Sequence, residues 1–191
     1  VCRNYYWRLS VCFISPHLQP RANYLMLNFA AIDLIRVLLG AALIYLAYID
    51  LRTFRLPDVI TIPLLMTGLC FNFLAFPSFT SPMNALLGAI FGFTLLWLGN
   101  FFYRKARNQD GIGMGDAKLL AALGSWFGWQ TLPMILFVAA LSGLLGGALW
   151  LYWNKQNYQK AFPFGPFLAF AGIIELIWPQ LLQNLLLSNP I

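Results

Sequence analysis

The sequence is poor in charged residues. Only 9% of its 191 residues are Asp, Glu, Lys or Arg, whereas a soluble domain typically carries about 25%. This scarcity is accompanied by 60% hydrophobic residues and a mean hydropathy of +0.70. The composition excludes an ordinary soluble domain and predicts an integral membrane protein that crosses the bilayer several times.

Metal-binding residues are scarce as well. The chain has one histidine, His17, and its cysteines are Cys2, Cys12 and Cys70, none in CxxC spacing. A zinc site needs a closely spaced set of such ligands, so we expect no bound metal and no cofactor. The net charge of +6 arises in short loops, without a basic patch interleaved with aromatic residues. We therefore expect the positive charge to set membrane topology rather than to bind nucleic acid.

The apolar runs predict an all-α, polytopic membrane helical bundle with about six transmembrane helices. The expected spans run from about 25 or 32 to 49, 59 to 76, 83 to 103, 116 to 129, 133 to 153 and 162 to 177. Residues 1–23 resemble no complete module. We therefore divide the chain into an atypical N-terminal segment, 1–23, and a transmembrane domain, 24–191.

Lys and Arg residues accumulate in alternate turns of this arrangement. They occupy 51–58, 104–118 and 154–160, whereas the opposite turns, 77–82 and 130–132, carry none. The positive-inside rule makes the first set of turns cytoplasmic. Three arginines before residue 23 do not follow this rule unless that segment also crosses the membrane.

Three carboxylates then fall at one depth, at the cytoplasmic edge of the bilayer. Asp50 ends a helix, whereas Asp58 and Asp116 begin helices; Asp33, expected to pair locally with Arg36, falls near the opposite face. An ionisable group at membrane depth costs about 3 kcal/mol or more and is functional by default. Two carboxylates that share a proton can activate water and protonate a leaving group, as in aspartic proteases.

Structural roles are open for the same residues. Asp116 could cap the first N–H groups of its helix, and a cap is the simpler explanation for Asp58. Gly113 and Gly115, which precede Asp116, permit either a positive φ or the close approach of another segment.

Three motifs in order carry a resemblance to a known family. They are Asp50 with Leu56-Pro57-Asp58, then Gly113-Met114-Gly115-Asp116-Ala117-Lys118 with Leu123-Gly124-Ser125-Trp126, and then Pro163-Phe164-Gly165-Pro166. Across about residues 30–178 the chain resembles the catalytic domain of type IV prepilin peptidases, which are GxGD-type intramembrane aspartyl proteases. The resemblance implies that Asp50 and Asp116 are catalytic. It also implies a set of motif or substrate-positioning residues: Asp58, Gly113, Gly115, Lys118, Pro163 and Gly165.

The family likeness implies an activity and a location. The expected substrate is a prepilin or pseudopilin precursor, cleaved after the glycine that ends a short basic leader, at the cytoplasmic face of the bacterial inner membrane. Many members also carry a cytoplasmic loop with two CxxC pairs and methylate the product. Here Tyr5 stands where the second cysteine after Cys2 would be, so we expect neither zinc nor methyl transfer. The likeness does not imply an oligomeric state.

A non-enzymatic membrane protein is the competing interpretation, either a degenerate relative of the peptidase or a proton-coupled carrier. A carrier usually shows a polar path through the bilayer. The middle of the expected spans is nearly all apolar, with Asn72 and Thr94 among the few exceptions. This pattern favours a peptidase at the membrane edge over a carrier.

Overall fold

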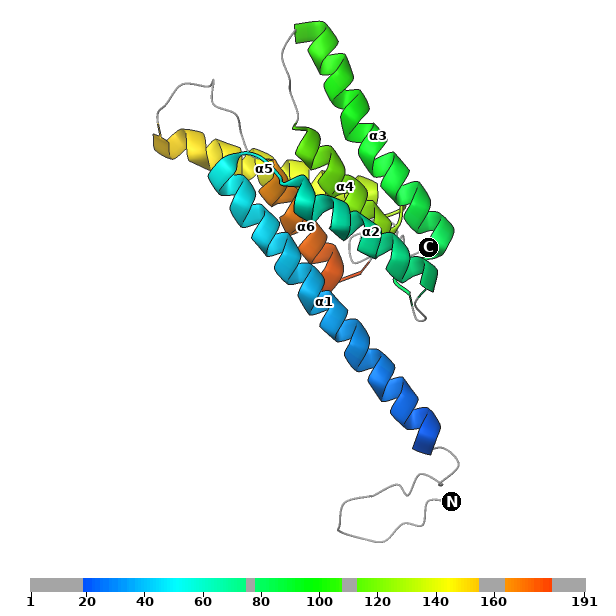
Figure 1. Ribbon diagram of the computed structural model, residues 1–191. Coiled ribbons are helices and arrows are strands. Elements are labelled where there is room, and N and C mark those ends of the chain that lie inside the picture. The colour runs from blue at the N-terminus through cyan, green and yellow to red at the C-terminus, as the bar shows by residue number, and fades with distance from the viewer. Residues whose placement is uncertain (1–18, 75–77, 108–112, 155–163, 180–191) are drawn as a thin grey trace, which may run out of the picture. The chain divides into compact units, whose positions relative to one another are not determined.

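The computed structural model describes residues 19–74, 78–107, 113–154 and 164–179, and all regular structure in these ranges is helical (Figure 1). The predicted all-α class is therefore confirmed. The chain divides into two compact units, Val1–Leu38 and Leu39–Ile191. The helices are α1 (Gln19–Thr53), α2 (Asp58–Leu74), α3 (Pro82–Arg107), α4 (Met114–Phe127), α5 (Leu132–Asn154) and α6 (Gly165–Ile177).

The described part of the first unit is the beginning of α1. Asp33 and Arg36 lie one turn apart there, with 3.4 Å between the carboxylate Oδ1 and the guanidinium Nη1. The expected local ion pair is thus confirmed.

The end of α1 differs from the expected boundary. The helix passes Asp50 and continues to Thr53, where the Phe54 N–H donates to the Asp50 carbonyl at 2.9 Å. Polar side chains at positions 52 and 53 do not end a helix. Termination instead comes at Phe54, which adopts a positive φ of 53°, just before the Leu56-Pro57 pair that disfavours helix.

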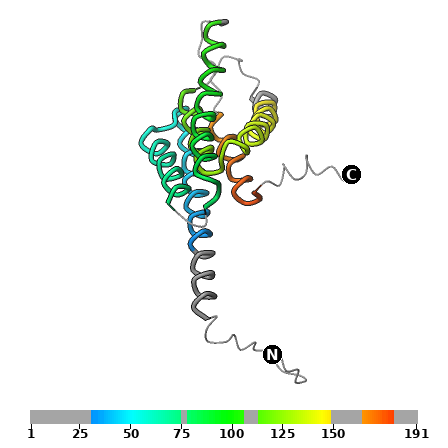
Figure 2. Tube along the Cα trace, turned by 90° about the vertical axis from the view of Figure 1, so that its right-hand side faces the viewer, coloured from blue at the N-terminus to red at the C-terminus, as the bar shows by residue number. Residues whose placement is uncertain are grey.

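The second unit is organised around α4. This helix packs against α2, α3, α5 and α6 (Figures 1 and 2). Ten of its 14 residues are buried, including Asp116 in its first turn and Ser125 in its last turn. Neighbouring helices therefore enclose α4 on most sides, which explains how a helix too short to cross a bilayer can carry a buried carboxylate.

Glycines bring two helix backbones into contact. A Cβ added to Gly92 of α3 would lie 2.7 Å from the Leu120 carbonyl oxygen of α4, and one on Gly88 would overlap the carbonyl of Gly124. Small residues spaced by four allow this close approach. A similar contact joins α5 to α6, where an added Cβ on Gly146 would lie 2.8 Å from the Phe167 ring.

Asn72 of α2 forms hydrogen bonds with the C-terminal end of α4. Its side-chain amide donates to the carbonyls of Ser125 at 2.8 Å and Trp126 at 3.1 Å, which lie in the last turn of α4 and lack helical partners. In return, the Trp126 Nε1–H donates to the Leu64 carbonyl at 2.9 Å. These bonds fix the height of α4 along α2.

Two of the described helices are long and apolar enough to cross a membrane, Ala31–Thr53 and Pro82–Lys105. Shorter apolar helices cover 58–74, 132–148 and 165–177. Large hydrophobic side chains are exposed on several of these helices, for example Val59 at 83% and Leu144 at 71%. An apolar outer surface of this kind is suited to lipid.

Candidate active site

Asp50 and Asp116 meet against the first residue of α6. Measured from the position that a Cβ on Gly165 would take, Asp50 Oδ2 is 2.6 Å away and Asp116 Oδ1 is 3.3 Å away. The two carboxylate oxygens are therefore at most about 6 Å apart, the sum of these distances. The fold thus brings together three positions, each taken from a different one of the three sequence motifs.

The pair is withdrawn from solvent. Asp50 is 4% exposed and Asp116 is 8% exposed. The Asp50 carboxylate accepts a hydrogen bond from the Gly165 backbone N–H, while its Oδ2 has no hydrogen-bond partner among the described residues. At a separation of about 6 Å or less, two negative charges repel by about 3 kcal/mol or more at an effective dielectric constant of 20. Such a pair favours a state in which one proton is shared between the two groups.

The start of α4 contradicts the cap interpretation of Asp116. Gly113 occupies the N-cap position with φ −65° and ψ 137°, and no side chain caps the helix. Asp116 lies three residues later, and its N–H donates to the Gly113 carbonyl at 3.1 Å. Asp116 is therefore not the N-cap, and Gly113 does not use a positive φ.

Gly115 is needed for a close approach. A Cβ at this position would lie 2.8 Å from the Leu56 Cβ, in the turn that precedes α2. The same addition at Gly113 would meet Asp116 Oδ2 at 3.6 Å, which is an ordinary contact distance. The two glycines of the motif are thus structurally different. Sequence reasoning named Leu56 in the first motif but gave it no role.

Asp58 pairs with Lys118 rather than with the other carboxylates. The Lys118 Nζ lies 2.6 Å from Asp58 Oδ1, and the two side chains are 32% and 56% exposed. Asp58 is the first residue of α2, while the Pro57 carbonyl accepts the first bonds of that helix from Ile60 and Thr61. The N-cap of α2 is therefore Pro57, one residue before Asp58, and the cap interpretation for Asp58 is wrong.

The expected cluster of three carboxylates reduces to the Asp50–Asp116 pair. Within the described ranges, no three His, Cys, Asp or Glu side chains lie close enough to hold a metal ion. Pro163, which the third motif contributes to the predicted set, lies outside the described residues.

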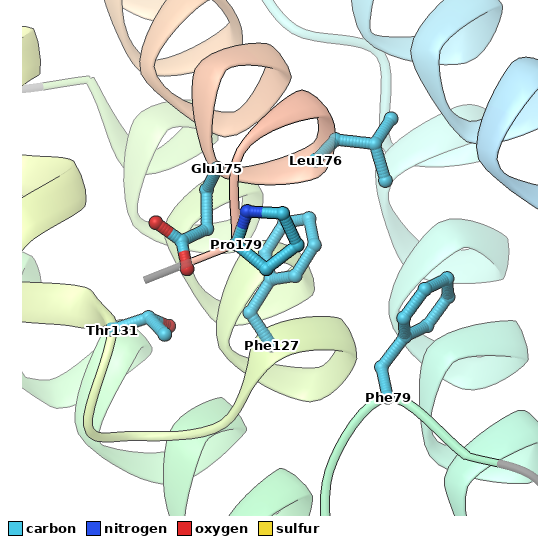
Figure 3. A pocket seen from close by; sticks show the side chains of 6 residues that line it. All are labelled: Phe79, Phe127, Thr131, Glu175, Leu176 and Pro179. Atoms are coloured by element: carbon cyan, nitrogen blue, oxygen red, sulfur yellow. The ribbon is translucent and has the colours of Figure 1, made fainter. Parts of the chain in front are cut away.

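Another buried carboxylate, Glu175, lies far from this pair. It is ten residues beyond Gly165 on α6, or about 15 Å along the helix axis. A cavity of about 60 Å³ opens beside it, and Figure 3 shows Glu175 and Thr131 on one side and the Phe79 ring on the other. The cavity is lined by Phe79, Phe127, Thr131, Glu175, Leu176 and Pro179.

Comparison with known proteins identifies a family. The model described as "Type IV leader peptidase family" matches residues 37–151, a range that includes both carboxylates of the pair. Curated proteins named "Prepilin leader peptidase/N-methyltransferase" are 40% identical over 153 residues in Aeromonas hydrophila, 43% over 145 in Dickeya chrysanthemi and 40% over 142 in Pseudomonas aeruginosa. These alignments cover 80%, 73% and 74% of this chain and 52%, 50% and 48% of the relatives. The chain thus spans about half the length of these relatives. No solved structure matches it significantly.

Proposed function

The chain belongs to the type IV leader peptidase family, and from this membership and the buried carboxylate pair we propose that it is a membrane aspartyl endopeptidase. Its substrates are prepilin or pseudopilin precursors, from which it removes the basic leader. The observation that carries the proposal is the convergence of Asp50 and Asp116 on Gly165, because it supplies two buried carboxylates within reach of one water molecule.

The chemistry follows from one shared proton. The ionised carboxylate accepts a proton from water, and the resulting hydroxide attacks the carbonyl carbon of the scissile peptide bond. The protonated carboxylate donates its proton to the carbonyl oxygen. One hydroxyl of the tetrahedral intermediate then gives its proton to the carboxylate that has become ionised, while the other carboxyl group protonates the leaving nitrogen. The C–N bond breaks, the amine leaves, and the pair again holds one proton. Asp50 and Asp116 exchange roles at each step, so both are required.

The remaining motif residues position this pair or the substrate. Gly115 admits Leu56 next to the first turn of α4, and the Lys118–Asp58 ion pair joins that same turn to the start of α2. Gly113 caps α4 ahead of Asp116. Gly165 lies against the two carboxylates, and Pro163 belongs to the segment that precedes Gly165 in the chain.

The protein is a membrane protein, and we assign it to the bacterial inner membrane with about six spans. The relatives are bacterial, and the exposed apolar helices are suited to lipid. Arg52, Arg55, Arg104 and Lys105 are all exposed in the turns that the positive-inside rule places in the cytoplasm. Asp50 lies next to this basic side, so the pair faces the cytoplasmic edge of the bilayer.

The test replaces each carboxylate by its neutral isostere. Asp50→Asn and Asp116→Asn keep the shape but remove acid–base function, so each should reduce leader removal from a co-expressed prepilin by about 100-fold or more. The double variant should be no worse, because groups that act as a unit are not additive. Cleavage is read as a mobility shift, and membrane levels are measured for each variant.

Asp33→Asn is the matched control, because it makes the same chemical change at an exposed aspartate on α1. It should cleave normally. Retained cleavage by Asp50→Asn at normal membrane levels would refute the assignment of the pair.

A further inference from the structure

This inference rests on the proposed function: we propose that Gly165 is a positioning residue for catalysis. Because it has no side chain, its α-carbon sets the separation of Asp50 and Asp116. Its backbone N–H holds the Asp50 carboxylate. The residue does not itself react. Its role is to allow α6 to come close enough for both carboxylates to lie against one point of its backbone.

A side chain at position 165 would displace the carboxylates that lie against its α-carbon. A Cβ there would lie 2.6 Å from Asp50 Oδ2, 3.0 Å from Asp50 Cγ and 3.3 Å from Asp116 Oδ1. Non-bonded heavy atoms prefer about 3.5–4.0 Å. A methyl group at this position would therefore push the Asp50 carboxylate outward by about 1 Å, away from its partner.

A second layer of close contacts lies farther along the same face of α6. Gly172 lies seven residues after Gly165, on the same face of α6. Its added Cβ would lie 2.6 Å from Leu123 of α4 and 3.3 Å from Leu43 of α1. Leu123 follows Asp116 by seven residues, and Leu43 precedes Asp50 by seven.

The three helices thus meet in two layers separated by two turns. The first layer holds Asp50, Asp116 and Gly165, and the second holds Leu43, Leu123 and Gly172. Leu43 and Leu123 are both fully buried. A glycine of α6 lies in each layer, where it leaves room for side chains of α1 and α4.

Electrostatics at the N-terminus of α6 also favour a carboxylate next to Gly165. Phe164 at the N-cap makes no side-chain cap bond, and Pro166 has no N–H to donate. The Gly165 N–H donates to Asp50, so a carboxylate from α1 caps α6 from outside the helix. The positive end of the helix favours a carboxylate at this place. Asp50 Oδ2 is buried and has no hydrogen-bond partner among the described residues.

The test is Gly165→Ala, measured in steady state with purified protein in liposomes and a prepilin substrate. A misplacement of about 1 Å at a reacting group costs about 100-fold in rate. We expect kcat to fall by about 100-fold while KM changes less than threefold, because the new methyl group contacts the carboxylates rather than the substrate.

Two controls separate positioning from packing. Gly143→Ala on α5 should leave both constants unchanged, because its Cβ would meet the Phe167 ring at 3.7 Å. Gly172→Ala is as crowded as Gly165→Ala but lies in the second layer, so it should lower thermal stability with much less effect on kcat. Equal losses of kcat in Gly165→Ala and Gly172→Ala would overturn the proposal.

A thermal-stability cycle tests the contact independently of activity. In an Asp50→Ala background the carboxylate is absent, so adding Gly165→Ala should cost much less stability than it does in the unmodified protein. If Gly165→Ala alone does not accumulate, the Asp50→Ala/Gly165→Ala protein should. Failure of both, or full kcat in Gly165→Ala, refutes the positioning role while the Asp50→Asn result still decides the proposed function.

Discussion

Alanine scanning of the motif glycines should separate Gly115 from Gly113. Gly115→Ala places a methyl group 2.8 Å from the Leu56 Cβ and 3.4 Å from its backbone nitrogen. The Leu56 Cβ is fixed to the backbone and cannot rotate away. Relief therefore requires the turn before α2 and the start of α4 to separate by about 1 Å, and overpacking of this kind typically costs about 1–3 kcal/mol.

The same displacement reaches the active site. Asp116 directly follows Gly115, so a shift of about 1 Å in this turn moves its carboxylate relative to Asp50 and should reduce cleavage by about 100-fold. Gly113→Ala adds a methyl group at an ordinary contact distance, at a φ of −65° that alanine adopts readily. It should retain cleavage within about tenfold.

A second-site change tests the mechanism. Leu56→Ala retains the Cβ and should not restore activity to Gly115→Ala, whereas Leu56→Gly removes the clashing atom and should restore part of it. Leader cleavage in membranes is measured with protein levels normalised. Equal damage from Gly113→Ala and Gly115→Ala, or equal rescue by both Leu56 variants, would refute this account.

Two further substitutions test the surroundings of the site. Asp58→Asn should retain cleavage within about tenfold. Its ion pair with Lys118 is exposed, and such pairs contribute about 0–1 kcal/mol to stability. An inactive Asp58→Asn variant would instead make Asp58 a member of the catalytic pair. Asn72→Leu should lower stability in detergent by about 1–3 kcal/mol, because it leaves buried α4 carbonyls without donors. Thr94→Val is its control, because Thr94 is exposed and donates within its own helix. An equal effect of both would show that Asn72 does not anchor α4.

The sequence was sufficient to predict the helices but not their environment. Long apolar runs predict five of the six helices to within about four residues at each end, because hydrophobic length and turn residues are local properties. The exception is α1, which begins at Gln19, ahead of the expected start at about 25 or 32. The central place of α4 is not local. Its run from Ala117 to Trp126 resembles a lipid-facing span in composition, and only the packing of α2, α3 and α6 around it buries nearly every side chain.

Asn72 shows the same limit for a single residue. From the sequence it was one of few polar groups in the middle of an apolar span, and it could have belonged to a proton path. In the structure its amide donates to α2 and α4 carbonyls, and its Oδ1 accepts from the Thr80 N–H at 3.1 Å. All four bonds go to the backbone. A side chain whose hydrogen bonds are all made to the backbone stabilises the bundle. Asn72 therefore does not support the interpretation of the chain as a proton-coupled carrier.

The motifs name the members of the candidate site, Asp50, Asp116 and Gly165, in order. Their geometry was not predictable from the sequence, because it depends on which turns of α1, α4 and α6 share a layer. The seven-residue spacings that link Asp50 to Leu43 and Asp116 to Leu123 become visible only after the three helices are placed side by side. A relative that had lost its activity would be under no requirement to keep a glycine beneath two buried carboxylates. The fit of Gly165 to that place therefore favours a working peptidase over a degenerate one.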